Sequence, residues 1–207
     1  MPTETITRSV TEKVKEAKPG TVFFPADLLE FGAPDAIHQT FSRLAKNKTL
    51  LRLAKGIYVK PVMDPELGAL RPSLEDVAQQ ISERDKVVIR PTGAAALNKL
   101  GLSTQVPTKV VYLTNGNPKR IQMGRSTIVF KKTTHKQLAV QPEMVFLATQ
   151  ALIALKDQAD DPGIIRQLTE VLAVEKPADI REGARLAPQR IGSILYQIAN
   201  SIEKSSI

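Results

Sequence analysis

The chain has 207 residues, of which 42% are hydrophobic and 24% charged, so it is long enough for two modest folded domains. It contains no cysteine, which excludes disulfides and thiolate metal sites, and its formal net charge of +8 favours a polyanionic partner. The first twenty residues are polar, and no run approaches the roughly eighteen apolar residues of a membrane span. We therefore expect a cytoplasmic protein with no membrane partner.

Two helices are predicted near the start of the chain. The first covers residues 25–31 and stops at Gly32, and a Gly-Ala-Pro turn leads into the second. The second helix has Pro34 near its start and four apolar residues on one face: Ile37, Phe41, Leu44 and Ala45. Two helices joined by a tight turn are typical of a helix-turn-helix.

The opposite face of the second helix is polar. Its residues are Asp35, His38, Gln39, Ser42, Arg43 and Lys46. Side chains of these types can hydrogen-bond base edges or phosphates. An ordinary amphipathic surface helix shows the same pattern, so the helix alone does not decide between the two interpretations.

A short basic hairpin is predicted directly after this helix. Two strand-like runs, residues 50–54 and 57–60, flank Lys55-Gly56, where glycine supplies the positive φ of a tight turn. Residues 36–60 hold six Lys or Arg and no Asp or Glu, which favours a DNA-contacting wing. We predict base contacts from His38, Gln39, Ser42 and Arg43, and phosphate contacts from Lys46, Arg52, Lys55 and Lys60.

Residues 18–61 also carry a motif pattern. It consists of Gly20-Thr21-Val22-Phe23, then Asp27-Leu28, then Ser42-Arg43-Leu44, and finally residues 50–58 (LLRLAKGIY) followed by Pro61. The pattern resembles the AbiEi-type antitoxins of bacterial type IV toxin–antitoxin (abortive infection) systems, which open with a winged-helix domain. Asn47-Lys48-Thr49 departs from it, because such proteins often place a glycine there. Since Asn tolerates the left-handed conformation, we expect the turn to survive.

A weaker resemblance extends over residues 86–142, through Thr92–Leu97 and Gly101–Pro107. The resemblance implies a repressor of its own operon that neutralises a toxin with a nucleotidyltransferase-like fold. Composition and periodicity by themselves indicate no toxin.

The charge is unevenly distributed along the second half of the chain. Residues 61–85 carry two basic and six acidic groups, whereas residues 86–142 carry ten basic groups and no acidic one. Within 86–142 we predict strands at 87–90, 109–114, 120–122 and 126–132, a helix at 93–100 and a turn at 115–118. These elements form a small α/β unit.

Five cations in this unit are predicted to form a second basic face: Lys119, Arg120, Arg125, Lys131 and Lys132. They fall on or beside a turn and strand ends, where they could contact flanking DNA, an RNA or an acidic toxin surface. Alternatively, they coat the solvent side of a sheet.

Four helices are predicted after Pro142, at about 143–156, 163–174, 178–186 and 188–203. The last carries an apolar stripe of Ile191, Ile194, Leu195, Ile198 and Ile202. Such a stripe either packs on the preceding sheet or forms a dimer or toxin interface.

The sequence offers little for catalysis. The basic segment has no carboxylates to hold a divalent cation, and the chain has no phosphate-binding glycine loop, no Gly-x-Ser-x-Gly elbow and no His-Glu-x-x-His pair. Its two histidines, His38 and His135, lie far apart in sequence. We predict that the protein is not an enzyme and needs no cofactor or metal.

Together these features predict an α+β protein with three parts. They are a winged helix-turn-helix at 1–62, an acidic linker and helix at 63–85, and a basic α/β domain with C-terminal helices at 86–207. We expect a DNA-binding antitoxin and autorepressor whose partners are double-stranded operator DNA and a nucleotidyltransferase-like toxin. A second copy of the chain is a further candidate partner. The alternative is a winged-helix protein-interaction module, or a transcriptional regulator without an antitoxin role.

Overall fold

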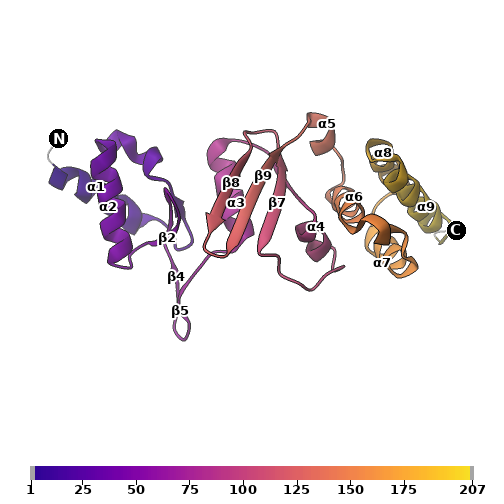
Figure 1. Cartoon of the computed structure of the whole chain (residues 1–207), viewed down its shortest axis with the longest axis horizontal. Coiled ribbons are helices and arrows are strands. Elements are labelled where there is room, and N and C mark those ends of the chain that lie inside the picture. Colours follow the sequence, from indigo (N-terminus) through magenta and orange to yellow (C-terminus); the bar gives the residue numbers. More distant parts are fainter. Residues whose placement is uncertain (1–2, 206–207) are drawn as a thin grey trace. The chain divides into compact units, whose positions relative to one another are not determined.

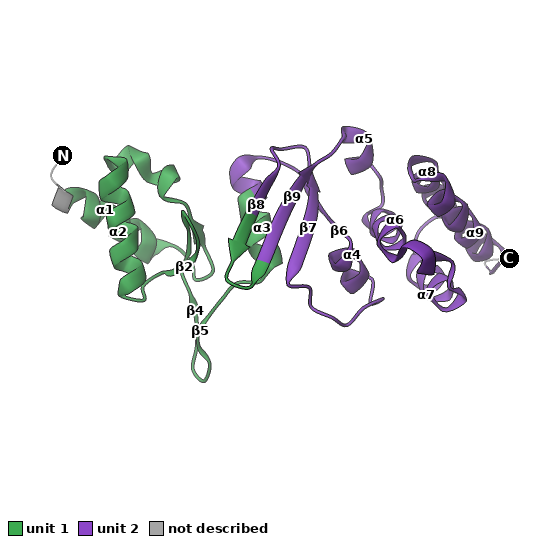
Figure 2. Ribbon diagram, in the orientation of Figure 1, with its two compact units in different colours: residues 1–81, 121–126 green, residues 82–120, 127–207 purple. Residues whose placement is uncertain are grey.

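A computed structural model describes residues 3–205, in which helices combine with several small sheets in a mixed α+β fold (Figure 1). The chain divides into two compact units (Figure 2). Unit 1 consists of residues 1–81 and 121–126, and unit 2 of residues 82–120 and 127–207. The α+β class predicted from the sequence is therefore confirmed.

Unit 1 begins with helix α1, Thr3–Glu16, which the sequence analysis did not predict. Its apolar residues Ile6, Val10 and Val14 recur every fourth position and are buried, so one face of the helix belongs to the core of unit 1. The predicted helix at 25–31 is a 3-10 helix, η1 (Pro25–Phe31), interrupted by non-helical angles at Leu28. The second predicted helix is α2, Pro34–Lys46.

The predicted hairpin is confirmed as strands β2 (Leu51–Ala54) and β3 (Ile57–Val59), which pair antiparallel. Gly56 lies in the turn with φ 71°, as a tight hairpin requires. A third strand, β1 (Val22–Phe23), pairs with the other edge of β3 and gives the order β1-β3-β2.

The turn between α2 and β2 survives without glycine, but the left-handed residue is not the one expected. Lys48 has φ 59°, whereas Asn47 has φ −82°. The N–H groups of Asn47 and Lys48 reach back to carbonyls of the last helical turn, and Thr49 and Leu50 donate to the carbonyl of Leu44. These bonds close the helix end although a lysine takes the positive φ.

The predicted acidic linker contains a hairpin that the sequence analysis missed. Strands β4 (Val62–Asp64) and β5 (Gly68–Leu70) pair antiparallel and form a separate two-stranded sheet. Helix α3, Leu74–Asp85, follows as predicted. The side chain of Gln80 on α3 joins it to the first strand, because its Nε2 donates to the Gly20 carbonyl and its Oε1 accepts from the Val22 N–H.

A four-stranded sheet with the order β6-β7-β9-β8 follows. Its strands are β6 (Ile89–Thr92), β7 (Lys109–Thr114), β8 (Lys119–Met123) and β9 (Ser126–Lys132), and helix α4 is Ala94–Lys99. Strands β6 and β7 are antiparallel, whereas β7 and β9 are parallel. All of these elements lie within a few residues of their predicted positions.

The C-terminal part of unit 2 is helical, as predicted. Its elements are α5 (His135–Leu138), α6 (Glu143–Leu155), the 3-10 helix η2 (Lys156–Asp160), α7 (Pro162–Leu172), α8 (Pro177–Leu186) and α9 (Gln189–Ser205). The apolar stripe of α9 is buried in the core of its own unit, with exposures of 0 to 6%. The suggestion that this stripe forms an interface with another chain is therefore wrong. No helix within residues 3–205 combines the length and apolarity needed to cross a membrane.

Candidate nucleic-acid interface

Helix α2 is anchored to its unit through the apolar face that the sequence predicts. Ile37, Phe41 and Leu44 are buried, with Phe41 fully enclosed. The Phe41 ring lies between two others, with centroids 6.3 Å from Phe23 on β1 and 5.0 Å from Tyr58 on β3. Such tilted aromatic pairs stabilise beyond their buried area, so one side chain fixes α2 against both strands.

The polar face of α2 points away from this core. All six residues predicted to lie on it are exposed: Asp35, His38, Gln39, Ser42, Arg43 and Lys46. These positions are spaced three or four residues apart, so they lie on one side of the helix. The structure therefore gathers the predicted base-reading residues His38, Gln39, Ser42 and Arg43 on one solvent-facing surface.

The β2–β3 hairpin adds exposed cations to unit 1. Arg52 on β2 and Lys55 in the turn are both exposed. The Arg52 guanidinium lies 6.0 Å from the centroid of the Tyr58 ring, its cross-strand partner. Lys48, in the turn after α2, is a further exposed cation that the sequence analysis did not include. Its position between a basic helix and a basic strand could have indicated it.

Lys60 differs from the other predicted phosphate contacts. Its Nζ donates to the main-chain carbonyls of Lys15 at 2.6 Å and Ala17 at 2.8 Å. These carbonyls belong to the end of α1 and the residues just after it, where helical partners are lacking and a cation is favourable. Lys60 thus closes a helix end, and we leave it out of the DNA-contacting set.

The five cations predicted as a second basic face do not share one face. Lys131 and Lys132 are neighbours in β9, so their side chains lie on opposite sides of the sheet. Lys119 is half-buried, pairs with Asp85 and places its Nζ 5.1 Å from the centroid of the Phe130 ring. Arg120 on β8 and Arg125 in the β8–β9 turn are exposed, as are Lys131 and Lys132.

Unit 2 contains a buried arginine, Arg90, whose role the sequence does not predict. Arg90 is 8% exposed, donates to the carbonyls of Leu138 and Val140, and stacks on Phe146. Burial lowers the pKa of its guanidinium, and the Glu143 carboxylate opposes this shift. Because every contact is internal, Arg90 joins β6 to the segment before α6 and offers nothing to a ligand.

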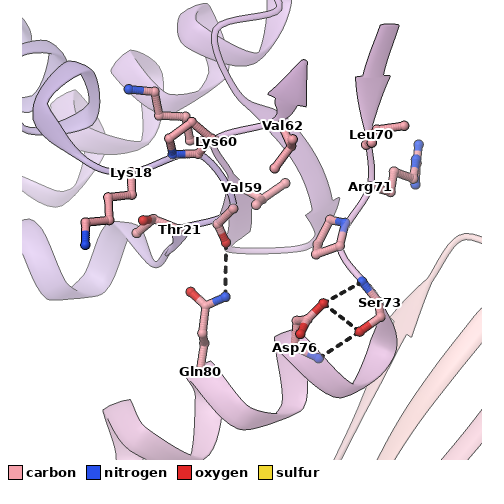
Figure 3. A pocket seen from close by; sticks show the side chains of 13 residues that line it. Lys18, Thr21, Val59, Lys60, Val62, Leu70, Arg71, Ser73, Asp76 and Gln80 are labelled. Carbon is pink, nitrogen blue, oxygen red and sulfur yellow. Dashed lines mark hydrogen bonds between the residues drawn. The ribbon is translucent and has the colours of Figure 1, made fainter. Parts of the chain in front are cut away.

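Unit 1 also contains an open cavity of about 540 Å³ (Figure 3). Two of its polar side chains, Ser73 and Asp76, hydrogen-bond each other. The Ser73 Oγ accepts from the Asp76 N–H at 3.0 Å, while the Asp76 carboxylate accepts from the Ser73 N–H and hydroxyl, which caps the start of α3. No group of three or more His, Asp or Glu able to hold a metal occurs in residues 3–205.

Comparison with known proteins places the chain in a family. No curated protein matches the sequence. Among solved structures, the crystal structure of the RV2827C protein from Mycobacterium tuberculosis aligns with a TM-score of 0.45 and 13% identity, over 94% of this chain and 81% of that one. The profile of a family of unknown function, DUF6088, matches residues 9–180, and the chain belongs to that family.

Proposed function

We propose that the protein binds double-stranded DNA, with α2 in the major groove and the β2–β3 hairpin on the phosphate backbone, as a winged helix does. One observation carries the proposal. The polar face of α2 is exposed along its whole length, while Phe41 on the opposite face holds the helix against the sheet that includes the hairpin. A rigidly held helix with an exposed polar face is the usual element for reading base edges.

Each residue type has a specific role in this arrangement. Arg43 and Gln39 are suited to bidentate contacts with guanine and adenine, and Asp35 can accept from a cytosine amino group. His38 and Ser42 lie between them and add single hydrogen bonds. Lys46, Arg52 and Lys55 are suited to phosphates, which fix the register of the protein on the duplex without reading sequence.

We further propose that the protein represses its own operon and neutralises a nucleotidyltransferase-like toxin. The resemblance of residues 18–61 to AbiEi-type antitoxins supports this role. Exposed cations on β8 and β9, such as Arg120 and Lys131, are available for an acidic partner surface. If a protein with that fold is encoded beside this chain, co-expression should relieve its toxicity and the two should co-purify.

The experiment that tests DNA binding uses the full chain and its own upstream promoter, compared with a scrambled duplex over a salt series. We expect tight binding to the promoter, weak binding to the scrambled duplex, and an affinity that falls steeply with salt. Weak and equal binding to both would contradict the proposal and favour the alternative of a protein-interaction module.

A further inference from the structure

The β4–β5 hairpin of unit 1 exposes apolar side chains. Val62 is 44% exposed, Met63 68% and Leu67 76%. Within the described residues, β4 and β5 pair only with each other, and an isolated two-stranded hairpin is marginally stable in water. Both features are typical of an element that packs against another surface.

The tip of this hairpin is also acidic and preorganised. Residues 61–70 contain Asp64 and Glu66 and no Lys, Arg or His, in a chain of net charge +8. The Asp64 Oδ1 accepts from the N–H groups of Glu66 at 2.9 Å and Leu67 at 2.8 Å. These bonds lower the pKa of Asp64, so its carboxylate stays ionised while it closes the turn.

The cavity of the same unit has the complementary character. Its walls include the apolar residues Val59, Val62 and Leu70, and its cations are Lys18, Lys60 and Arg71. Figure 3 shows Lys18 and Arg71 on opposite sides of the cavity.

The cavity has two cations that are open to an anion. Among the residues that the structure describes, Asp76 is the one acidic residue that lines the cavity, and its carboxylate accepts from the Ser73 hydroxyl. The Lys60 ammonium already donates to main-chain carbonyls at the end of α1. Lys18 and Arg71 make no side-chain ion pair within residues 3–205, so both remain available to an anion at the cavity mouth.

We propose that the hairpin tip of one copy of the chain seats in this cavity of a second copy, and that the second copy reciprocates. Leu67 enters the apolar part of the cavity, Glu66 faces Arg71, and Asp64 faces Lys18. Hairpin and cavity lie side by side on one unit and share the paired residues Val62 and Leu70, so a two-fold arrangement lets each copy fill the cavity of the other. A reciprocal contact of this kind gives a closed two-fold dimer.

The occupant is a second copy because the two surfaces carry opposite charges and both are partly apolar. The hairpin is the acidic, apolar partner, and the cavity is the apolar, cationic one. This dimer does not depend on DNA binding, although two-fold symmetry would suit an operator with two half-sites.

The test is sedimentation equilibrium of the full chain over a concentration series. We expect the wild type to form a dimer, and Glu66→Arg and Arg71→Glu each to raise its dissociation constant roughly ten-fold or more by placing like charges together. The double variant Glu66→Arg/Arg71→Glu should restore the dimer, because the charges are exchanged and not removed. Lys13→Glu, at an exposed α1 position that does not line the cavity, should leave the dimer unchanged.

Circular dichroism melts of each variant would show that it is folded before its oligomeric state is compared. A wild type that stays monomeric at every concentration would overturn the proposal, as would single variants that dimerise normally or a double variant that does not recover. A monomer that still binds its promoter would overturn this dimer alone and leave the proposed DNA binding intact.

Discussion

The guanidinium carbon of Arg90 lies 3.8 Å from the centroid of the Phe146 ring. The same guanidinium satisfies the carbonyls of Leu138 and Val140, so stacking and hydrogen bonding are combined in one buried group.

We predict that Arg90→Met lowers the free energy of unfolding by about 2–4 kcal/mol, since two carbonyls lose their donor and the stacking is lost. Urea unfolding followed by circular dichroism measures this change. Arg120→Met, at an exposed strand position, is the matched control and should change stability little.

Gly192 on α9 sits directly against the backbone of α8. A Cβ placed there would lie 2.7 Å from the Ala184 carbonyl oxygen, a contact that neither helix can avoid without moving apart. Gly192→Ala should therefore destabilise unit 2 by about 1–3 kcal/mol, although alanine is the better helix former. Ser193→Ala, one residue further on the exposed side of α9, should be neutral or stabilising. Equal stability of the two variants would contradict this close packing.

The Glu203 carboxylate accepts from the Arg181 guanidinium at 2.6 Å and 3.4 Å, and this hydrogen bonding lowers the pKa of Glu203. Because the folded pKa lies below the unfolded one, the pair contributes stability above the unfolded pKa and loses it as pH falls through the folded pKa. Arg181→Gln should raise the pKa of Glu203 toward its ordinary value in an NMR titration. The stability difference between wild type and variant should narrow in acid, where only the pH-independent bond from Arg181 to the Asn200 side chain still distinguishes them. Arg166→Gln on α7, an exposed arginine, should leave the Glu203 titration unchanged.

Arg43 and Lys55 should affect promoter binding in different ways. Arg43→Ala should cost about 1–3 kcal/mol on the promoter and little on a scrambled duplex, because it removes the proposed base contact. Lys55→Ala should weaken both duplexes similarly and reduce the salt slope by about one unit, as expected for a lost phosphate contact. Fluorescence anisotropy over a salt series measures both effects. Lys13→Ala, an exposed cation on α1, controls for loss of one positive charge.

Lys60 should behave differently from Lys55. Lys60→Met removes the donor to the Lys15 and Ala17 carbonyls, so it should lower thermal stability while leaving the salt slope of promoter binding unchanged. A reduced salt slope with unchanged stability would return Lys60 to the phosphate-contacting set.

The elements that the sequence predicts correctly are those whose pattern is local. Helix α2 is marked by Ile37, Phe41 and Leu44 on one face, and the β2–β3 turn by a glycine that must adopt a positive φ. Helix α1 has an equally regular pattern in Ile6, Val10 and Val14, and it could have been predicted from that pattern although the residues between these three are polar.

The features that the sequence does not predict depend on distant partners. Strand β1 has two residues and exists because Val22 pairs with Val59. The role of Lys60 depends on carbonyls some forty-five residues earlier in the chain, and that of Arg90 on carbonyls about fifty residues later. In the candidate site, periodicity predicts which side chains of α2 face solvent, but not which cations are already engaged by the backbone.

The position of Phe41 between Phe23 and Tyr58 has a consequence for recognition. Because one ring touches both strands, the spacing between α2 and β3 is set in the free protein and would not have to be established on the proposed DNA partner. A preorganised surface loses little conformational entropy on association. A substitution at Phe41 would therefore alter affinity for a duplex without changing a single charge or hydrogen-bonding group at the interface.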